Sequence, residues 1–422
     1  MFEFSLVPLG QLAEIRMGQS PDSTYVYEGS EQGVPFLQGN AEFGVKHPAA
    51  KYSCTQPAKI AEQGSSLISV RAPVGETNIA DQLYCIGRGL AAVKFHRYGA
   101  SLGRELLSFS AKSLDKVSQG TTFAAIGGAD LRTLLVADIP NQEAKVLERI
   151  LDTLDTQIQK TEALIAKLEK VKEGLLHDLL TRGIDENGQL RPGPEQAPEL
   201  YKESLLGLIP RGWDALSIGQ LSVLVTSGSR GWAEYYSDSG DLFIRSQNVR
   251  MGRIELTDQQ YVTPPSDGEG QRTSVKPCDL LVTITGNSVG NIANVSEEWS
   301  REAFVSQHVG LIRFHQPELS KFSEIFLVKG APGNRQLLDA QYGQSKPGLS
   351  LDNLRSLVIP VPPQYERDEL VGKIESIQAR ILAEKASLIK LITQKLGLMD
   401  DLLTGRVRVT PLLDQTQATT PA

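Results

Sequence analysis

Residues 143–182 read EAKVLERILDTLDTQIQKTEALIAKLEKVKEGLLHDLLTR, and residues 366–405 read ERDELVGKIESIQARILAEKASLIKLITQKLGLMDDLLTG. In the first stretch, steps of four and three connect the apolar residues Leu147, Leu151, Leu154, Ile158, Ile165, Leu168, Leu175 and Leu179. In the second stretch, the same steps connect Leu370, Ile374, Ile377, Ile381, Leu388, Leu391, Leu398 and Leu402. Such spacing aligns side chains along one narrow stripe of an α-helix. The pattern predicts two helices, each about 60 Å long at ~1.5 Å per residue.

The two stretches repeat each other at a constant offset. Each apolar position of the first stretch meets its counterpart 223 residues later, as Leu147 meets Leu370. The polar interruptions keep the same register, because Lys172 corresponds to Lys395. We expect the stems of these two lysines to lie along the stripe while their ammonium groups reach water. A period of this size predicts two copies of one module, each ending in a long helix.

A narrow apolar stripe favours another helix as its partner, and the equivalent helix of the other copy is the nearest candidate. Antiparallel pairing within the chain predicts that Leu151 lies near Leu398 and Ile158 near Leu391. Two alternatives remain at this point. Each helix packs separately on its own globular neighbour, or the helices pair between two chains.

Composition narrows the class of protein. The chain has 422 residues, a net charge of −7 and three widely spaced cysteines. It lacks a long apolar run and a signal-peptide pattern, which predicts a cytoplasmic protein away from membranes. Its acidity is not typical of a stand-alone nucleic-acid binder. Residues 205–363, however, contain 10 arginines against 4 lysines, and arginine suits both guanine edges and protein interfaces.

Turn residues and the repeat divide the chain into an α+β arrangement with an internal pseudo-two-fold repeat. We expect two mixed α/β domains joined by a pair of long antiparallel, coiled-coil-like helices. The predicted segments are a first domain (1–140), a central helix (141–183), a Pro/Gly-rich linker (184–204), a second domain (205–363), a C-terminal helix (364–407) and a flexible tail (408–422). The globular domains repeat more loosely, with Leu67–Val70 matching Leu281–Ile284. Their scaffolds are therefore expected to agree while their loops differ.

No pattern in the chain predicts chemistry of its own. Phosphate loops, dinucleotide-binding turns, nucleophile elbows and metal-ligand spacings are all missing from the sequence. We therefore expect no catalytic residue, no bound metal and no cofactor.

The layout resembles the specificity subunits of type I restriction-modification systems over roughly residues 1–410. The resemblance rests on ILDTLDTQI at 150–158, TEALIAKL at 161–168, KEGLLHDLLTRG at 172–183, LIPRGW at 208–213 and GSSLISVRAPVG at 64–75. The Pro-Pro-x-x-Glu-Gln entry that often precedes the family's helices is reduced here at 139–143 and 361–366.

The resemblance implies two target-recognition domains, each reading one half of a split site in double-stranded DNA, with the helices as a spacer. It also implies assembly with two methyltransferase subunits and two motor-nuclease subunits. S-adenosylmethionine, ATP and Mg would then act on those partners, and this chain would be non-catalytic. A coiled-coil interaction scaffold or adaptor without sequence-specific DNA binding is the alternative, and an enzyme is a third possibility.

Polar side chains near turns are the candidates for DNA contact, because base edges and phosphates are bound mainly by arginine, lysine and amides. In the first domain these are Gln38, Asn40, Lys46, Arg71 and Arg88. In the second they are Arg230, Arg245, Gln247, Arg250, Arg272 and Asn287. Asn40 and Asn248 occupy equivalent places, so the alternative for Asn40 is that both residues cap the scaffold.

Overall fold

The protein is described by a computed structural model covering residues 3–29, 33–111, 125–228, 230–264, 269–343 and 347–413. The chain divides into two compact units, residues 1–163 with 385–422 (unit 1) and residues 164–384 (unit 2). Two long helices, α5 (Asn141–Thr181) and α10 (Gln364–Leu403), each contribute one half to each unit. No described helix is both long enough and apolar enough to cross a membrane.

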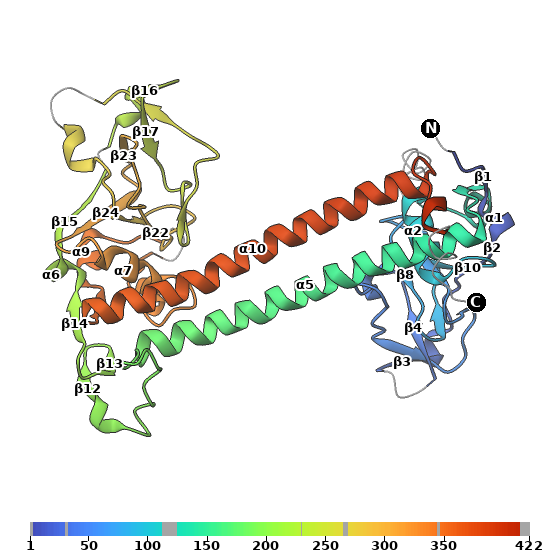
Figure 1. Ribbon diagram of the computed structural model, residues 1–422, viewed down its shortest axis with the longest axis horizontal. Helices are drawn as coiled ribbons and strands as arrows, with labels where there is room; N and C mark the ends of the chain where they lie inside the picture. Colours follow the sequence, from blue (N-terminus) through green and yellow to red (C-terminus); the bar gives the residue numbers. More distant parts are fainter. Residues whose placement is uncertain are drawn as a thin grey trace. The chain divides into compact units, whose positions relative to one another are not determined.

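The halves of α5 and α10 pair within each unit, and they run antiparallel (Figure 1). In unit 1, Lys395 of α10 donates a hydrogen bond to Asp155 of α5 at 2.6 Å. In unit 2, Lys172 of α5 donates to Gln378 of α10. These contacts confirm antiparallel pairing within the chain.

The predicted stripe is buried or half-buried with one exception. Fifteen of the sixteen positions are buried or half-buried, but Leu398 is 36% exposed. Met399 takes its place and is 7% exposed, in the same core cluster as Leu151. Leu151 is 1% exposed, and its predicted proximity to Leu398 stays a prediction.

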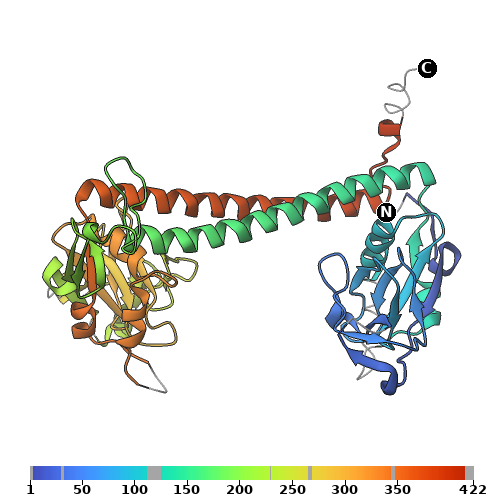
Figure 2. The same ribbon diagram turned by 90° about the horizontal axis from the view of Figure 1, so that it is seen from below.

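Unit 1 contains two sheets. A four-stranded antiparallel sheet has the order β2 (Ala13–Met17), β10 (Leu90–Phe95), β7 (Ser66–Ser69) and β8 (Thr77–Ile79). A five-stranded sheet has the order β3 (Val26–Glu28), β5 (Tyr52–Cys54), β4 (Val34–Leu37), β9 (Tyr84–Ile86) and β6 (Ile60–Ala61). Around them lie α1 (Leu9–Leu12), α2 (Ala100–Ala111), α4 (Gly128–Thr133) and the pair β1 (Leu6–Pro8) with β11 (Leu135–Ala137). Figure 2 shows these strands, in blue and cyan, on one side of the helix ends.

Unit 2 repeats this strand order, except that its second sheet lacks a counterpart of β6 among the described residues. Its four-stranded antiparallel sheet has the order β15 (Ser222–Ser227), β24 (Val309–Phe314), β21 (Leu280–Thr283) and β22 (Ile292–Asn294). Its second sheet has the order β16 (Tyr236–Ser237), β20 (Tyr261–Val262), β17 (Asp241–Ile244) and β23 (Ala303–Val305). Further elements are α6 (Ile218–Leu221), α7 (Leu319–Leu327), α8 (Asn334–Asp339), α9 (Leu351–Ser356), the pair β14 (Asp214–Ser217) with β25 (Val358–Val361), and the hairpins β12 (Tyr201–Ser204) to β13 (Gly207–Pro210) and β18 (Val249–Arg250) to β19 (Arg253–Ile254). The repeat predicted from the sequence is confirmed in the strand order.

Each unit buries the helix ends in its main core. Ala144, Leu147 and Leu151 of α5 join the core of unit 1, and Leu370 and Ile374 of α10 join that of unit 2. Burying a leucine or isoleucine side chain contributes about 1.5–3 kcal/mol. The first residues of each stripe therefore pack into the core of a globular unit, in addition to the pairing of the two helices.

The segment expected as a linker, 184–204, is more than a polar tether. Ile184 pairs with Leu190 in an isolated β-bridge, and Ile184, Ala197 and Tyr201 are buried. The predicted boundary at 204/205 falls inside the β12–β13 hairpin. Of the predicted tail, residues 408–413 are described, and 414–422 lie outside the described residues.

Candidate nucleic-acid interface

In unit 1, four chain segments meet at one end of the four-stranded sheet. Val70 donates its backbone N–H to Gly89 at 2.9 Å, and Gly87 donates to Leu37 at 2.8 Å. Gly18 donates to Leu90 at 2.8 Å. Segments 18–20, 37–39, 70–72 and 87–89 therefore form one continuous surface, which we call the unit 1 sheet end.

This surface gathers three of the predicted DNA-contacting residues. Gln38, Arg71 and Arg88 are all exposed there. Arg88 donates from Nε to Ser20 Oγ at 3.4 Å, a contact across the same surface. Asn40 begins the short helix η2 (Asn40–Glu42) just beyond it and is half-buried.

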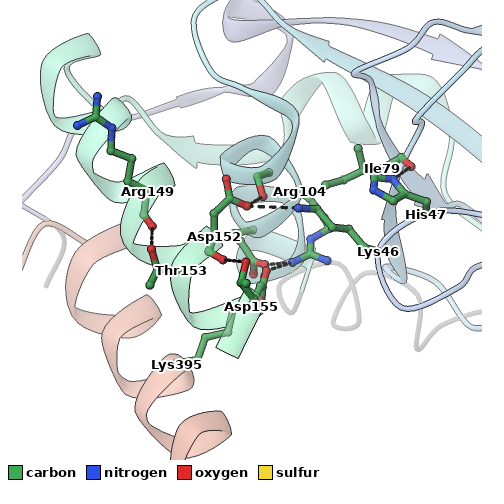
Figure 3. Close-up of polar contacts among 12 residues, drawn as sticks. Lys46, His47, Ile79, Arg104, Arg149, Asp152, Thr153, Asp155 and Lys395 are labelled. Atoms are coloured by element: carbon green, nitrogen blue, oxygen red, sulfur yellow. Dashed lines mark hydrogen bonds and ion pairs between the residues drawn. The ribbon is translucent and has the colours of Figure 1, made fainter. Parts of the chain in front are cut away.

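Lys46 lies elsewhere in unit 1. Its Nζ is 3.6 Å from a carboxylate oxygen of Asp152 on α5 (Figure 3). The backbone carbonyl of Lys46 accepts a hydrogen bond from the N–H of Ile79 in β8. Lys46 therefore contacts α5 and does not lie on the sheet end with Gln38 and Arg71.

In unit 2, the corresponding segments meet in the same way. Ile284 donates its N–H to His308 at 2.9 Å, and Gly228 donates to Ser306 at 3.2 Å. Ser306 in turn donates to Ile244 at 2.9 Å. Segments 228–230, 244–248, 284–287 and 306–308 form the unit 2 sheet end, with Ser229 outside the described residues.

The predicted residues of unit 2 fall on or beside this surface. Arg230, Arg245, Gln247 and Asn287 lie on its segments. Arg272 in η5 (Glu269–Thr273) reaches it, donating to the carbonyl of Ser227 at 3.0 Å and to the hydroxyl of Thr226. Arg250 is on the β18–β19 hairpin, whose Gly252 donates its N–H to Ile292 at 2.8 Å.

The arginines differ in how much of their charge is already satisfied. Within the described part of the chain, no carboxylate pairs with Arg71, Arg88 or Arg230, and all three are exposed. Unpaired, exposed guanidinium groups suit phosphates and guanine edges. Arg245, by contrast, pairs with Asp258 at 3.1 Å, and Arg250 lies 3.8 Å from Glu255. The first three are therefore the stronger candidates for direct contact with an anion.

Sequence reasoning missed several polar groups at these surfaces. Asp258 contacts both Arg245 and Gln247, although it lies more than ten residues further along the chain. Thr285 Oγ1 and His308 Nδ1 are 2.5 Å apart at the unit 2 sheet end. No spacing rule connects such residues, because loops from different strands bring them together.

The expectation that Lys395 points its ammonium to water is wrong. In unit 1, Lys395 Nζ lies 2.6 Å from Asp155 and 2.8 Å from Glu105 of α2, and Arg104 also pairs with Asp155 at 2.8 Å (Figure 3). These side chains are between 5 and 15% exposed. The lysine therefore joins α10 to α5 and to the globular part of unit 1.

A buried carboxylate lies in the first turn of each long helix. Glu366 of α10 accepts hydrogen bonds from Trp213 Nε1 at 3.0 Å, from the N–H of Ile184 at 2.9 Å and from both terminal nitrogens of Arg191. Burial opposes the charge of Arg191, but the hydrogen bonds and charge of Glu366 outweigh it and raise the pKa of Arg191. These contacts hold the segment after α5 onto the start of α10.

The counterpart in unit 1 uses different residues for the same purpose. Glu143 of α5 accepts from Nε of Arg408 at 2.9 Å and from its terminal nitrogen, and this hydrogen bonding raises the pKa of Arg408. The Arg408 guanidinium also stacks 4.8 Å from the ring centre of Phe4. Carboxylate, arginine and aromatic ring thus recur at both helix starts.

Among the described residues, no group of three or more His, Cys, Asp or Glu side chains is arranged to hold a metal ion. What the two sheet ends offer is hydrogen-bond donors and acceptors on loops of a rigid scaffold, which is chemistry suited to binding.

Comparison with curated proteins identifies relatives of one kind. The chain is 36% identical over 187 residues to a putative type I restriction enzyme MjaX specificity subunit from Methanocaldococcus jannaschii, covering 43% of this chain and 44% of that protein. Type I restriction specificity subunits are its relatives. The MjaVIII specificity subunit of the same organism is 22% identical over 272 residues, covering 64% of this chain and 61% of that protein. The matches thus span about half of these relatives' length, and no family model matches.

Solved structures agree on the fold. A type I restriction-modification S subunit from M. genitalium superposes with a TM-score of 0.58 at 16% identity, covering 95% of this chain and 96% of that one. A chain from a study of complex assembly and conformational transition of the type I R-M system gives a TM-score of 0.57 at 14% identity, covering 96% and 98%. The fold expected from the resemblance is confirmed.

Proposed function

We propose that this chain is the DNA-recognition subunit of a type I restriction-modification complex and that it reads a bipartite site. The observation that carries the proposal is the pair of sheet ends. Two units that share the order of their four-stranded sheets place exposed polar loops at corresponding positions, and the residues of those loops differ. A shared scaffold with different loops suits the recognition of two different half-sites.

The relatives support this role, because they are specificity subunits. Under this proposal the chain is non-catalytic and assembles with two methyltransferase and two motor-nuclease subunits. S-adenosylmethionine, ATP and Mg would be bound by those partners. The net charge of −7 is compatible with this arrangement, since partners can supply phosphate contacts that dominate DNA affinity. Nothing in the comparisons supports a scaffold without DNA recognition.

Methylome sequencing tests the proposal. The full chain is expressed with the methyltransferase subunit of its own system in a host that lacks other adenine methylation. We expect methylated adenines at one asymmetric, split sequence. Exchanging residues 1–130 for the matching domain of a relative should change one half-site and leave the other unchanged.

Arg335→Ala provides a matched surface control, because Arg335 is 80% exposed on α8 and far in sequence from either sheet end. It should leave the methylated sequence unchanged. Methylation without sequence preference, or a hybrid in which both half-sites change together, would overturn the proposed function.

A further inference from the structure

Two loops of unit 2 are held together by one buried side chain. Asn248 is 3% exposed, and its Oδ1 accepts from the N–H of Arg245 at 3.0 Å. Its Nδ2 donates to the carbonyls of Glu255 at 3.0 Å and Asp258 at 2.9 Å. Asn248 thereby satisfies three backbone groups at once and fixes segment 255–258 against segment 245–248. It is a scaffold residue, as the cap alternative suggested for this position.

On this fixed base, one exposed carboxylate contacts two candidate DNA-binding side chains. An Oδ2 atom of Asp258 lies 3.1 Å from Arg245 and also accepts a hydrogen bond from Nε2 of Gln247. Arg245 donates a further bond to the carbonyl of Asp258 at 3.2 Å. Gln247 and Asp258 are both exposed, whereas the Arg245 side chain is only 22% exposed.

The carboxylate determines which way the Gln247 amide faces. An ionised carboxylate only accepts hydrogen bonds, so the amide must present its nitrogen to Asp258. When the N–H that points away from the amide oxygen binds Asp258, the other N–H and the amide oxygen remain available side by side. A donor next to an acceptor is the pattern that an amide needs for the N7 and N6 groups of adenine in the major groove.

We propose that Gln247 reads an adenine in the half-site of unit 2, and that Asp258 is the positioning residue that fixes the orientation of its amide. This inference rests on the proposed function and specifies one of its contacts. Arg245 supports the arrangement from beneath, because its guanidinium holds the carboxylate in place. Segment 244–248 also contacts the strand that leads to Asn287, because Thr283 Oγ1 donates a hydrogen bond to the carbonyl of Ser246 at 3.5 Å.

The test selects bound duplexes from a pool randomised across both half-sites. The full chain is used in complex with the methyltransferase subunit of its system, as wild type, Gln247→Ala and Asp258→Asn. Wild type should prefer adenine at one position of one half-site by roughly 5- to 150-fold, as expected for a good bidentate contact. Gln247→Ala should reduce that preference to less than about twofold and leave all other positions unchanged.

Asp258→Asn should relax the same position. An asparagine amide can donate as well as accept, so the Gln247 amide is free to turn over. A residue that merely stabilised the loop would instead weaken binding to all sequences equally. Asp238→Asn and Gln271→Ala are the matched controls, because both side chains are exposed in unit 2 and lie outside the Asn248 loops.

The outcomes distinguish a failure of the Gln247 inference from a failure of the proposed function. If Gln247→Ala preserves every base preference while wild type discriminates, the inference about Gln247 is overturned. If Gln247→Ala relaxes one position and Asp258→Asn does not, the positioning role of Asp258 is overturned. A wild-type complex without any sequence preference would overturn the proposed function itself. Thermal unfolding of each variant confirms that it is folded.

Discussion

Replacing Glu366 by alanine should destabilise unit 2 strongly, because four donors converge on that carboxylate. The Glu366 side chain is fully buried, and the Arg191 side chain that pairs with it is 16% exposed. The substitution would leave the Arg191 guanidinium without its partner. It would also leave Trp213 Nε1 and the N–H of Ile184 without acceptors in a buried place.

The expected loss of stability follows from the groups that Glu366→Ala leaves without a partner. Removing one partner of a buried ion pair costs about 3–5 kcal/mol, since the other charge stays desolvated. Each unsatisfied buried donor adds about 1–3 kcal/mol, although these effects overlap and are not additive. We therefore expect a loss of roughly 3–5 kcal/mol in the free energy of unfolding of unit 2. With a urea slope of about 2–3 kcal/mol per molar, the midpoint should fall by about 1–2.5 M.

Tryptophan fluorescence makes this measurement specific. The chain has three tryptophans, Trp213, Trp232 and Trp299, and all of them are in unit 2. Fluorescence in a urea titration therefore reports the unfolding of unit 2 alone, whereas circular dichroism reports both units. Glu143→Ala is the equivalent change in unit 1. It should leave the fluorescence transition nearly unchanged. In circular dichroism it should move the unfolding of unit 1 to a lower urea concentration.

Glu369→Ala is the matched control, because Glu369 lies one turn further along α10, is 44% exposed and pairs only with Lys373 among the described ion pairs. An exposed pair of this kind is worth about 0–1 kcal/mol. If Glu366→Ala shifted the fluorescence midpoint no more than Glu369→Ala, the argument that this network fastens the helix start would be refuted.

Three further predictions concern the helices and the sheet ends. Leu151→Asp should lower the free energy of unfolding by several kcal/mol, because Leu151 is 1% exposed. Leu398→Asp should change it by only about ±0.5 kcal/mol, because Leu398 is 36% exposed. Urea unfolding followed by circular dichroism compares the two variants. Inserting four residues after Lys170 lengthens α5 by about 6 Å, so methylome sequencing should show the gap between half-sites changed by one or two base pairs with both half-sites retained. Arg71→Ala should weaken discrimination in the half-site of unit 1 alone by about 1–3 kcal/mol if Arg71 contacts a base edge, and selection from a randomised duplex pool would show an equal loss across all sequences if it contacts phosphate.

The long helices and the repeat were predictable because they depend on local periodicity. An α-helix repeats every 3.6 residues, so a stripe of leucine and isoleucine reveals its buried face without knowledge of the partner. Which residue at the edge of the stripe is buried is harder to predict. Leu398 is 36% exposed and its neighbour Met399 is 7% exposed, and both are apolar side chains of similar size. Residue type therefore could not show which of the two is buried.

The polar contacts were not predictable to the same extent. Lys395 interrupts an apolar stripe, which indicates a special position, but its partner Glu105 lies 290 residues away. The same limit applies to the sheet ends. Gln38, Arg71 and Arg88 were proposed from their residue types near turns, and the strand order then brought their segments together. Lys46 had the same residue chemistry and was directed to Asp152 by the fold.

The two helix starts show how one module tolerates change in its loops. Each places a carboxylate in its first turn, where the helix dipole favours negative charge, and each carboxylate holds an arginine from a segment outside the helix. The arginine and the aromatic ring come from different parts of the chain, Arg191 with Trp213 in unit 2 and Arg408 with Phe4 in unit 1. The exposed side chains of the sheet ends, such as Arg71, Arg88 and Gln247, take no part in these two networks. Substitutions there should therefore alter what is bound before they alter whether the unit folds.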